Sequence, residues 1–345
     1  MAEGYATTLA AHVTGSRRPR LAALRGCPPG PGPGAFSAGF DIEYQYLARR
    51  PRSCYPKRVG TRVTERRSPT PGPGVRLLGV VNVTPDSFSD GGAFLEPDAA
   101  RAHVDSLLAA GADVLDIGGE STRPGSTPVG ADEQLRRIEP VVRHALARGA
   151  VVSIDTQDPL VAERMLGLGA RYVNDVSCLA DPDLASVTAR HDATLILMHS
   201  RGSMSEMRGF SQYADDAYDD VVADVAREWS AARERARARG LAVERCFLDP
   251  GLGFAKNARH SLTLLARLSE LTALGAPIVV GPSRKSFIAE VGSAAPGERL
   301  GGTIAACLHA ASAGAAMLRV HDVFAVRQAL ALGRALGRPP EVTHA

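Results

Sequence analysis

Short apolar runs occur eight times along the chain, and each ends in polar residues with useful chemistry. They lead into Asn82, Asp116 with Glu120, Asp155, Asn174, His199, Asp249, Lys285, and Arg319 with His321. Near-continuous apolar runs are typical of parallel strands that are covered on both faces. Parallel strands point the same way, so their polar ends gather at one face, which is where barrel enzymes place their sites.

The expected elements alternate regularly between strands and helices. The expected strands are 75–83, 112–118, 150–155, 171–176, 194–199, 246–251, 277–281 and 315–320. The expected helices are 98–111, 132–148, 159–169, 215–239, 257–275, 299–314 and 322–337, most of them ending at a glycine. This alternation predicts an α/β fold, a (β/α)8 TIM barrel. A doubly wound open sheet is the alternative, but the GxGxxG turn expected after its first strand is missing.

Residues 1–74 differ in composition from the rest of the chain. They contain CPPGPGPG and SPTPGPG with scattered arginines and few apolar residues in any period. Such a segment cannot bury enough apolar surface to offset the entropy of ordering it. We therefore expect a largely disordered extension over 1–74 and one catalytic barrel domain over 75–340. An organelle transit peptide and an over-long gene start are alternatives for the extension.

Charge and cysteine content exclude several classes of protein. Residues 1–74 hold 12 Lys or Arg and 4 acids, so the net charge of +3 leaves about −5 for the remainder. The barrel is therefore not expected to bind nucleic acid, and a basic nucleic-acid module rests on the extension alone. No run of 18 apolar residues predicts a membrane span. Five scattered cysteines without a CxxC pair suggest a reducing compartment, and hence the cytoplasm.

Lysine is rare in this chain, which suggests a chemical reason for each lysine in the barrel. Among 40 basic residues only Lys57, Lys256 and Lys285 are lysines. Both barrel lysines follow strand-like runs. A solvated surface position is the alternative for each, and it is favoured more for Lys256 than for Lys285.

A polar loop, NVTPDSFSDGG over 82–92, follows the first expected strand. Its turn-forming residues would suit a solvated turn. Its length and its acids favour a mobile lid that bears Asp86 and Asp90 and is anchored by Asn82.

Seven sequence blocks resemble the signatures of the dihydropteroate synthase family. In that family's order they are NVTPDSFSDGG (82–92), GGESTRPG (118–125), SIDT (153–156), NDVS (174–177), LDPGLGFAK (248–256), GPSRKSF (281–287) and RVHDV (319–323). The resemblance spans about residues 76–337. It implies a transferase of folate biosynthesis that joins 6-hydroxymethyl-7,8-dihydropterin pyrophosphate to p-aminobenzoate and releases pyrophosphate.

The resemblance places a pterin ring among the strand ends. It implies that Asp249, Asn174 and Asp155 bind the ring's N–H and amino groups, because carboxylates accept and amides do both. Lys285 would face the ring carbonyl and N5, and Arg319 would stack on the ring. The apolar lining would be Met198, Phe254, Ile196, Val176 and Gly281. A helix N-cap is the alternative for Asp155 and a turn is the alternative for Asp249, while core positions remain equally open for Met198 and Ile196.

The resemblance also implies a diphosphate site and a p-aminobenzoate site. Asn82 would ligate Mg²⁺ at the diphosphate, together with Thr122, Arg123, Arg319 and His321. A helix-capping role is the alternative for His321. The p-aminobenzoate would lie near Phe88, Pro124, Lys285 and Ser286, with its carboxylate at the start of a helix and Asp90 helping to position it. The residues implied in catalysis are Asp86, Asp90, Lys285, Arg319 and His321.

The chain departs from the family pattern at a few rim positions. His199 is followed by Ser200 and Arg201 where Met and Gln are usual, Cys178 replaces a common glycine, and Pro282 replaces a small residue. These changes bear on substrate affinity and on the family's role as a sulfonamide target.

Two related functions are alternatives to the synthase. A pterin-binding methyltransferase domain would lack the SRKS and STRPG blocks, and a catalytically silent paralogue would show damage in the lid or at Lys285. The expected partners are small-molecule substrates, without nucleic acid or membrane. A second copy of the chain is expected too, because the family is dimeric and the 299–314 helix is rich in small residues.

Overall fold

Eight parallel strands form the centre of the structure, a computed structural model that describes residues 74–84, 96–121, 128–202 and 213–337. The strands are β1 (Arg76–Asn82), β2 (Val114–Gly118), β3 (Val152–Asp155), β4 (Tyr172–Asp175), β5 (Thr194–Met198), β6 (Cys246–Asp249), β7 (Val279–Val280) and β8 (Met317–Val320). All eight lie within the expected ranges, so the strand pattern predicted from the apolar runs is confirmed.

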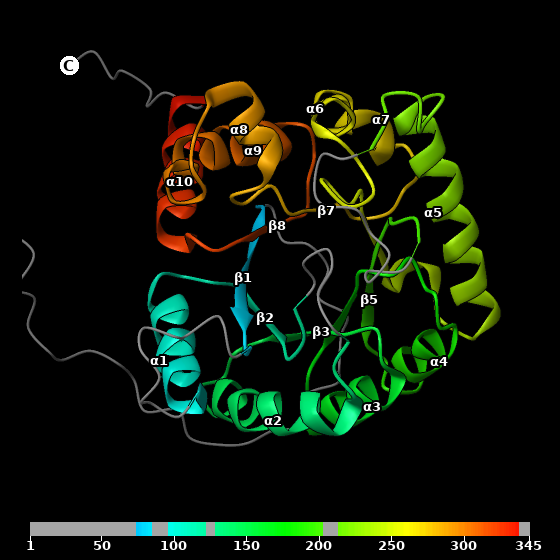
Figure 1. Cartoon of the computed structure of the whole chain (residues 1–345). Coiled ribbons are helices and arrows are strands. Elements are labelled where there is room, and N and C mark those ends of the chain that lie inside the picture. The colour runs from blue at the N-terminus through cyan, green and yellow to red at the C-terminus, as the bar shows by residue number, and fades with distance from the viewer. Residues whose placement is uncertain (1–73, 85–95, 122–127, 203–212, 338–345) are drawn as a thin grey trace, which may run out of the picture. The chain divides into compact units, whose positions relative to one another are not determined.

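The strands form one sheet that curls into a nearly closed ring. Their order is β6-β5-β4-β3-β2-β1-β8-β7, and every pairing is parallel. The two edge strands meet through a parallel bridge between Leu248 and Ile278, where the Leu248 N–H donates to the Pro277 carbonyl at 3.0 Å. Figure 1 shows the strands inside and the helices around them. The (β/α)8 barrel is therefore confirmed and the open doubly wound sheet is excluded.

Helices connect successive strands on the outside of the ring. They are α1 (Glu96–Ala109), α2 (Ala131–Ala147), α3 (Pro159–Leu168), α4 (Asp183–Arg190), α5 (Val221–Ala238), α6 (Ala258–Ala266), α7 (Leu268–Thr272), α8 (Ser286–Gly292), α9 (Leu300–Ser312) and α10 (Val323–Gly337), with 3-10 turns η1 (Val243–Arg245) and η2 (Pro296–Glu298). Their apolar faces pack on the strands in one continuous core that includes Trp229, whose indole N–H donates to the Leu197 carbonyl at 3.1 Å. None of the described helices has both the length and the apolar composition needed to cross a membrane.

Three helix predictions differ from the structure. No helix was expected between β4 and β5, but α4 lies there and buries Leu184 and Val187. The expected start at residue 215 is wrong, because Asp220 caps α5 by accepting from the N–H groups of Val222 and Ala223. The single helix expected over 257–275 is interrupted at Arg267, which separates α6 from α7.

The barrel interior contains a layer of apolar side chains. Seven strands each contribute one buried residue to it: Leu78, Val114, Tyr172, Ile196, Phe247, Val279 and Met317. Side chains from seven strands can touch one another only inside the ring. Because side chains alternate along a strand, the residue two positions further on points inward as well. This layer therefore fixes which residues face the carboxyl end of the barrel.

The cap of α3 provides a test of the local structure. Asp158 accepts from the N–H groups of Leu160 and Val161, so replacing Asp158 with Ala should lower the free energy of unfolding by about 1 kcal/mol. Asp132→Ala is a matched control, because Asp132 lies in the first turn of α2, where no side chain caps the helix. Urea denaturation measures both variants, and an equal loss in the two would contradict the capping role.

Candidate active site

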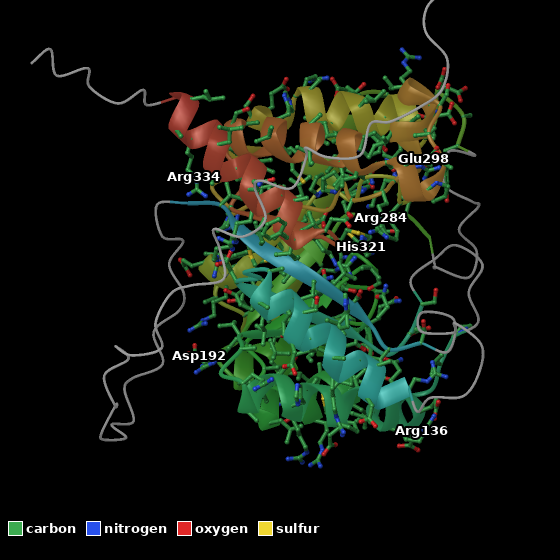
Figure 2. The ribbon with its side chains drawn as sticks, turned by 90° about the vertical axis from the view of Figure 1, so that its left-hand side faces the viewer. Arg136, Asp192, Arg284, Glu298, His321 and Arg334 are labelled. Carbon is green, nitrogen blue, oxygen red and sulfur yellow. The ribbon has the colours of Figure 1, made fainter. Side chains whose placement is uncertain are left out.

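The polar residues predicted for the site lie two positions beyond the apolar layer. Val114 precedes Asp116, Tyr172 precedes Asn174, Phe247 precedes Asp249, and Met317 precedes Arg319, each by two residues. Strand alternation therefore turns all four polar side chains inward at the carboxyl end. The same end carries Arg284 and His321, whereas Asp192 and Arg334 lie at the other end (Figure 2).

Arg319 is held between two buried carboxylates. Its Nε donates to Asp116 Oδ2 at 2.6 Å, and its Nη2 donates to Asp155 Oδ2 at 2.7 Å. Although burial acts to lower the pKa of Arg319, the two carboxylates raise it overall. The guanidinium is therefore a fixed cation whose orientation is set by strands β2 and β3.

Asp116 also orients Asn174. The Asn174 Nδ2 donates to Asp116 Oδ2 at 3.0 Å, so the amide oxygen of Asn174 remains to accept hydrogen bonds. The sequence analysis placed Asp116 at a strand end but gave it no role. The inward alternation from Val114 was the signal that could have identified it.

The carboxylates keep unused acceptors. Within the described part of the chain, Asp116 Oδ1 and Asp155 Oδ1 are buried and have no hydrogen-bond partner. Burial raises the pKa of Asp155 to about 7, although Arg319 acts to lower it. Buried acceptors of this kind cost free energy unless a ligand supplies donors. The N-cap alternative for Asp155 is excluded, because Asp158 caps α3.

Asp249 has two functions in the structure. Its Oδ1 accepts from the Gly251 N–H at 2.8 Å, so the expected turn is present. Its Oδ2 faces the inside of the barrel near Gly281, where a Cβ would lie 3.9 Å from Oδ2 and 3.7 Å from the Cβ of Arg319. Burial raises the pKa of Asp249, and Lys285 partly opposes this. A glycine at 281 leaves open the space between Asp249 and Arg319.

Lys285 lies beside the loop that follows β6. Its Nζ donates to the Leu252 carbonyl and lies 4.5 Å from the ring centroid of Phe254. Burial lowers the pKa of Lys285 to about 8, although Asp249 acts to raise it. Lys285 can therefore donate to a ligand and change its charge close to neutral pH.

Phe254 belongs to a small apolar cluster separate from the main core. The cluster consists of Val176, Met198, Phe254 and Ala255, with Tyr213 packed against it. Ile196 lies instead in the apolar layer below, so its expected place in the lining is wrong and the core alternative holds. Met198, two residues beyond Ile196, is the inward residue at the height of Asp249, with which it pairs in register.

His321 is bonded to Ser283 rather than to a helix end. Ser283 Oγ lies 3.0 Å from His321 Nδ1 and accepts from the His321 backbone N–H at 3.3 Å. Burial, together with Arg319 and Arg284, lowers the pKa of His321 to about 4. A neutral ring whose Nδ1 accepts from the hydroxyl leaves Nε2–H as a donor. Ser283 had no role in the sequence analysis.

Several predicted residues lie outside the described residues: Asp86, Phe88, Asp90, Thr122, Arg123 and Pro124. Asn82 ends β1 and is partly exposed, and Ser286 is the first residue of α8, which confirms the expected helix start. Lys256 is fully buried, so the alternative of a surface position is excluded for it.

The described residues contain no group of three or more His, Cys, Asp or Glu that could hold a metal ion. Magnesium keeps several waters and binds proteins through one or two oxygen ligands plus substrate phosphates. The amide oxygen of Asn82 is an oxygen donor of the kind that such an ion takes.

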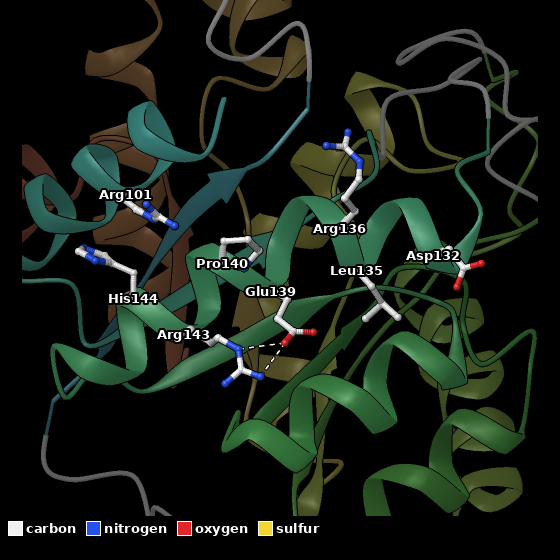
Figure 3. Close-up of a pocket in the computed structure, with 8 residues that line it drawn as sticks. All are labelled: Arg101, Asp132, Leu135, Arg136, Glu139, Pro140, Arg143 and His144. Atoms are coloured by element: carbon white, nitrogen blue, oxygen red, sulfur yellow. Dashed lines mark hydrogen bonds and ion pairs between the residues drawn. The ribbon is translucent and has the colours of Figure 1, made fainter. Parts of the chain in front are cut away.

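A hollow of about 690 Å³ lies away from the strand ends, on the outer surface of α2 (Figure 3). Its arginines are already paired: Arg143 with Glu139 at 2.6 Å, and Arg136 with Glu133 at 2.6 Å. Its His144 lies 3.0 Å from Asp105. These ion pairs leave little unmet charge, and the chemistry lies at the carboxyl ends of the strands.

Comparisons with known proteins agree with this arrangement. Residues 78–321 match the family described as pterin binding enzyme. A dihydropteroate synthase from Synechocystis is 41% identical over 265 residues, which cover 76% of this chain and 90% of that protein. The Xanthomonas albilineans dihydropteroate synthase solved with 4-aminobenzoic acid has a TM-score of 0.71 and 41% identity, covering 78% of this chain and 95% of that one. The same enzyme solved with 7,8-dihydropteroate has a TM-score of 0.69 and 39% identity, with the same coverage.

The raised pKa of Asp155 predicts a pH dependence of stability. Burial raises this pKa to about 7 in the folded chain, whereas an exposed aspartate titrates near about 3.9. The folded state therefore binds the proton more tightly, and this contribution to stability is present below about pH 4 and is lost as the pH rises through about 7. Asn cannot titrate, so stability relative to Asp155→Asn should fall over that range. Urea titrations at several pH values test this, and a constant difference would contradict it.

Proposed function

The chain belongs to the pterin binding enzyme family, and we infer that it catalyses the dihydropteroate synthase reaction. In this reaction 6-hydroxymethyl-7,8-dihydropterin pyrophosphate and p-aminobenzoate give 7,8-dihydropteroate and pyrophosphate. The observation that supports this best is the polar layer at the carboxyl end of the barrel. There Arg319 is fixed by Asp116 and Asp155 beside Asn174, Asp249 and Lys285.

The groups of this layer complement the edge of a pterin ring. A pterin presents ring N–H and amino donors along one edge, and the carboxylate of Asp249 would accept from two of them. The amide oxygen of Asn174 is free because its nitrogen bonds Asp116, and Asp155 Oδ1 is a buried acceptor without a partner in the described structure. Lys285 would donate to the ring carbonyl and N5. Arg319 would lie flat against the ring, which a lysine could not do.

The diphosphate is assigned to the side of the site opposite the amino edge of the pterin ring. Arg319 and the Nε2–H of His321 supply donors there, joined by Thr122 and Arg123 from residues outside the described structure. Asn82 would hold Mg²⁺ together with diphosphate oxygens, and the ion would supply charge to offset the leaving group. His321 suits this role as a neutral hydrogen-bond donor, because burial lowers its pKa to about 4.

The chemistry needs stabilisation of the leaving anion more than a strong base. The bond between the methylene carbon and the diphosphate oxygen breaks, and diphosphate takes the electron pair. The neutral amine of p-aminobenzoate forms the new C–N bond and afterwards releases a proton to water. Fixed cations and donors lower the barrier because they need no reorganisation. The carboxylate of p-aminobenzoate is assigned to Ser286 at the start of α8, with Asp86 and Asp90 on the lid.

Turnover by the purified chain tests the proposed function. With both substrates and Mg²⁺ we expect dihydropteroate and pyrophosphate to form in equal amounts, measured by chromatography and by a phosphate assay. Pterin binding without product would favour the silent paralogue, and methyl transfer would favour the methyltransferase reading.

Asp249 should dominate recognition of the ring. Asp249→Asn replaces one acceptor by a donor that faces the ring's own donors, so pterin affinity should fall by about 2 to 4 kcal/mol. Calorimetric titration with the pterin substrate measures it. Asp183→Asn, at an exposed acid on α4, is the control. Unchanged affinity in Asp249→Asn would sink the assignment.

We also propose that the chain forms a homodimer in the cytoplasm. Helix α10 exposes three large apolar side chains, with Phe324 67%, Leu332 59% and Leu336 74% exposed. Exposed apolar side chains on one helix favour an interface. Three cysteines of the described barrel, Cys178, Cys246 and Cys307, are free, which suits a reducing compartment.

Substitution on α10 tests the dimer. Leu332→Glu combined with Leu336→Glu should give a monomer by light scattering, because two charges would be buried at the interface. Leu160→Glu on α3 is the matched control, since Leu160 is 69% exposed. A wild type that is monomeric, or a double variant that remains dimeric, would contradict the proposal.

A further inference from the structure

A buried lysine lies on the loop that carries Phe254, next to the proposed pterin site. Lys256 follows β6 and is fully buried. Its Nζ lies 2.9 Å from His199 Nδ1, and donates to the Phe254 carbonyl at 2.9 Å and the His199 carbonyl at 3.4 Å. Burial, together with Lys285, lowers the pKa of Lys256 to about 7. In its charged form Lys256 has three protons for these three acceptors.

The partner histidine must then be neutral and hold its proton on Nε2. His199 Nε2 lies 3.0 Å from Glu228 Oε2, and a carboxylate can only accept, so the proton is on Nε2. Nδ1 is then free to accept from Lys256. Burial and Lys256 lower the pKa of His199 to about 4, which agrees with a neutral ring.

Arg201 completes this network. Its guanidinium binds both oxygens of Glu228, at 2.9 and 2.5 Å, and stacks 3.8 Å from the ring centroid of Tyr218. Hydrogen bonds from His199 and Arg201 lower the pKa of Glu228. Glu228 is therefore a fixed carboxylate that sets the tautomer of His199.

Lys256 joins the end of β5 to the loop after β6. That loop carries the Leu252 carbonyl, which binds Lys285, and Phe254, whose ring lies against the Lys285 ammonium. The packing is close, since a Cβ on Gly251 would lie 2.1 Å from the His199 carbonyl oxygen. Movement of Lys256 would therefore shift the backbone on which Lys285 and Phe254 rest.

We propose that Lys256 is a positioning residue of the pterin site. Held by His199, which Glu228 orients, Lys256 fixes the 250–257 loop so that Phe254 and Lys285 meet the ring in one geometry. This inference rests on the proposed function for the identity of the ligand. The position of the loop follows from the contacts within the chain.

The tautomer of His199 gives a test that needs no activity. In chain labelled with ¹⁵N-histidine, we expect His199 to be neutral with the proton on Nε2 at pH 7. His199→Gln identifies its signal among the nine histidines. A proton on Nδ1 would overturn the proposal, because Lys256 could not then donate to that nitrogen.

Lys256→Met tests the link to the pterin. Methionine has a similar length but no donors, so the dissociation constant of 6-hydroxymethyl-7,8-dihydropterin pyrophosphate should rise at least about tenfold. Tyr172→Phe is the control, since it removes one partly buried hydrogen bond, from Arg76 at 2.8 Å, at the opposite end of the barrel.

Each outcome has a definite reading. Weaker pterin binding in Lys256→Met, at equal loss of melting temperature and with unchanged binding in Tyr172→Phe, supports the proposal. Unchanged pterin binding in Lys256→Met, or equal weakening in both variants, overturns it. If Lys256→Met does not fold, the His199 tautomer in the wild type decides. A wild type that binds the pterin but forms no dihydropteroate contradicts the proposed function alone.

Discussion

The arrangement of the site depends on one buried ion-pair group, Arg319 between Asp116 and Asp155. Removing three charges from water costs several kcal/mol per ion, and mutual attraction offsets this only with good geometry. The structure supplies that geometry through bonds of 2.6 and 2.7 Å from Arg319 to carboxylates on the adjacent strands β2 and β3. Each carboxylate still keeps one buried oxygen without a partner in the described residues. The group is therefore stable as a unit but incomplete until a ligand brings donors.

Barrel geometry explains why the charges lie where they do. One layer of seven apolar side chains fills the interior, and the next inward position on each strand is at the carboxyl end. Polar residues there face a space lined by protein, which raises the pKa of Asp155 and Asp249 and lowers that of Lys285 through burial. Shifts in these directions are common where a protein must bind or transform a charged substrate. Lys256, His199 and Glu228 form a second group of paired polar side chains, next to the site.

Much of the fold could be predicted from the sequence, because eight apolar runs that alternate with helical segments are typical of a (β/α)8 barrel. The predicted site residues Asp155, Asn174, Asp249, Lys285 and Arg319 do lie at one end of the barrel. The sequence did not predict those features of the structure that depend on tertiary contacts. Helix α4 has only eight residues, and Asp220 begins α5 through hydrogen bonds that composition does not reveal. The contacts of Lys256 with His199 and Phe254 could not be predicted, so a surface position remained open for it. Asp116 could be assigned to the site only once Val114 was known to point into the barrel.

A crystal structure of the chain with 6-hydroxymethyl-7,8-dihydropterin pyrophosphate tests the central claim most directly. The account predicts that the ring lies flat against Arg319, with its amino edge on Asp249 and Asn174 and with a hydrogen bond to the Oδ1 of Asp155. The diphosphate should lie on the side of His321 and Asn82. A ring bound elsewhere, with Asp155 Oδ1 and Asp249 Oδ2 left without donors, would contradict the account.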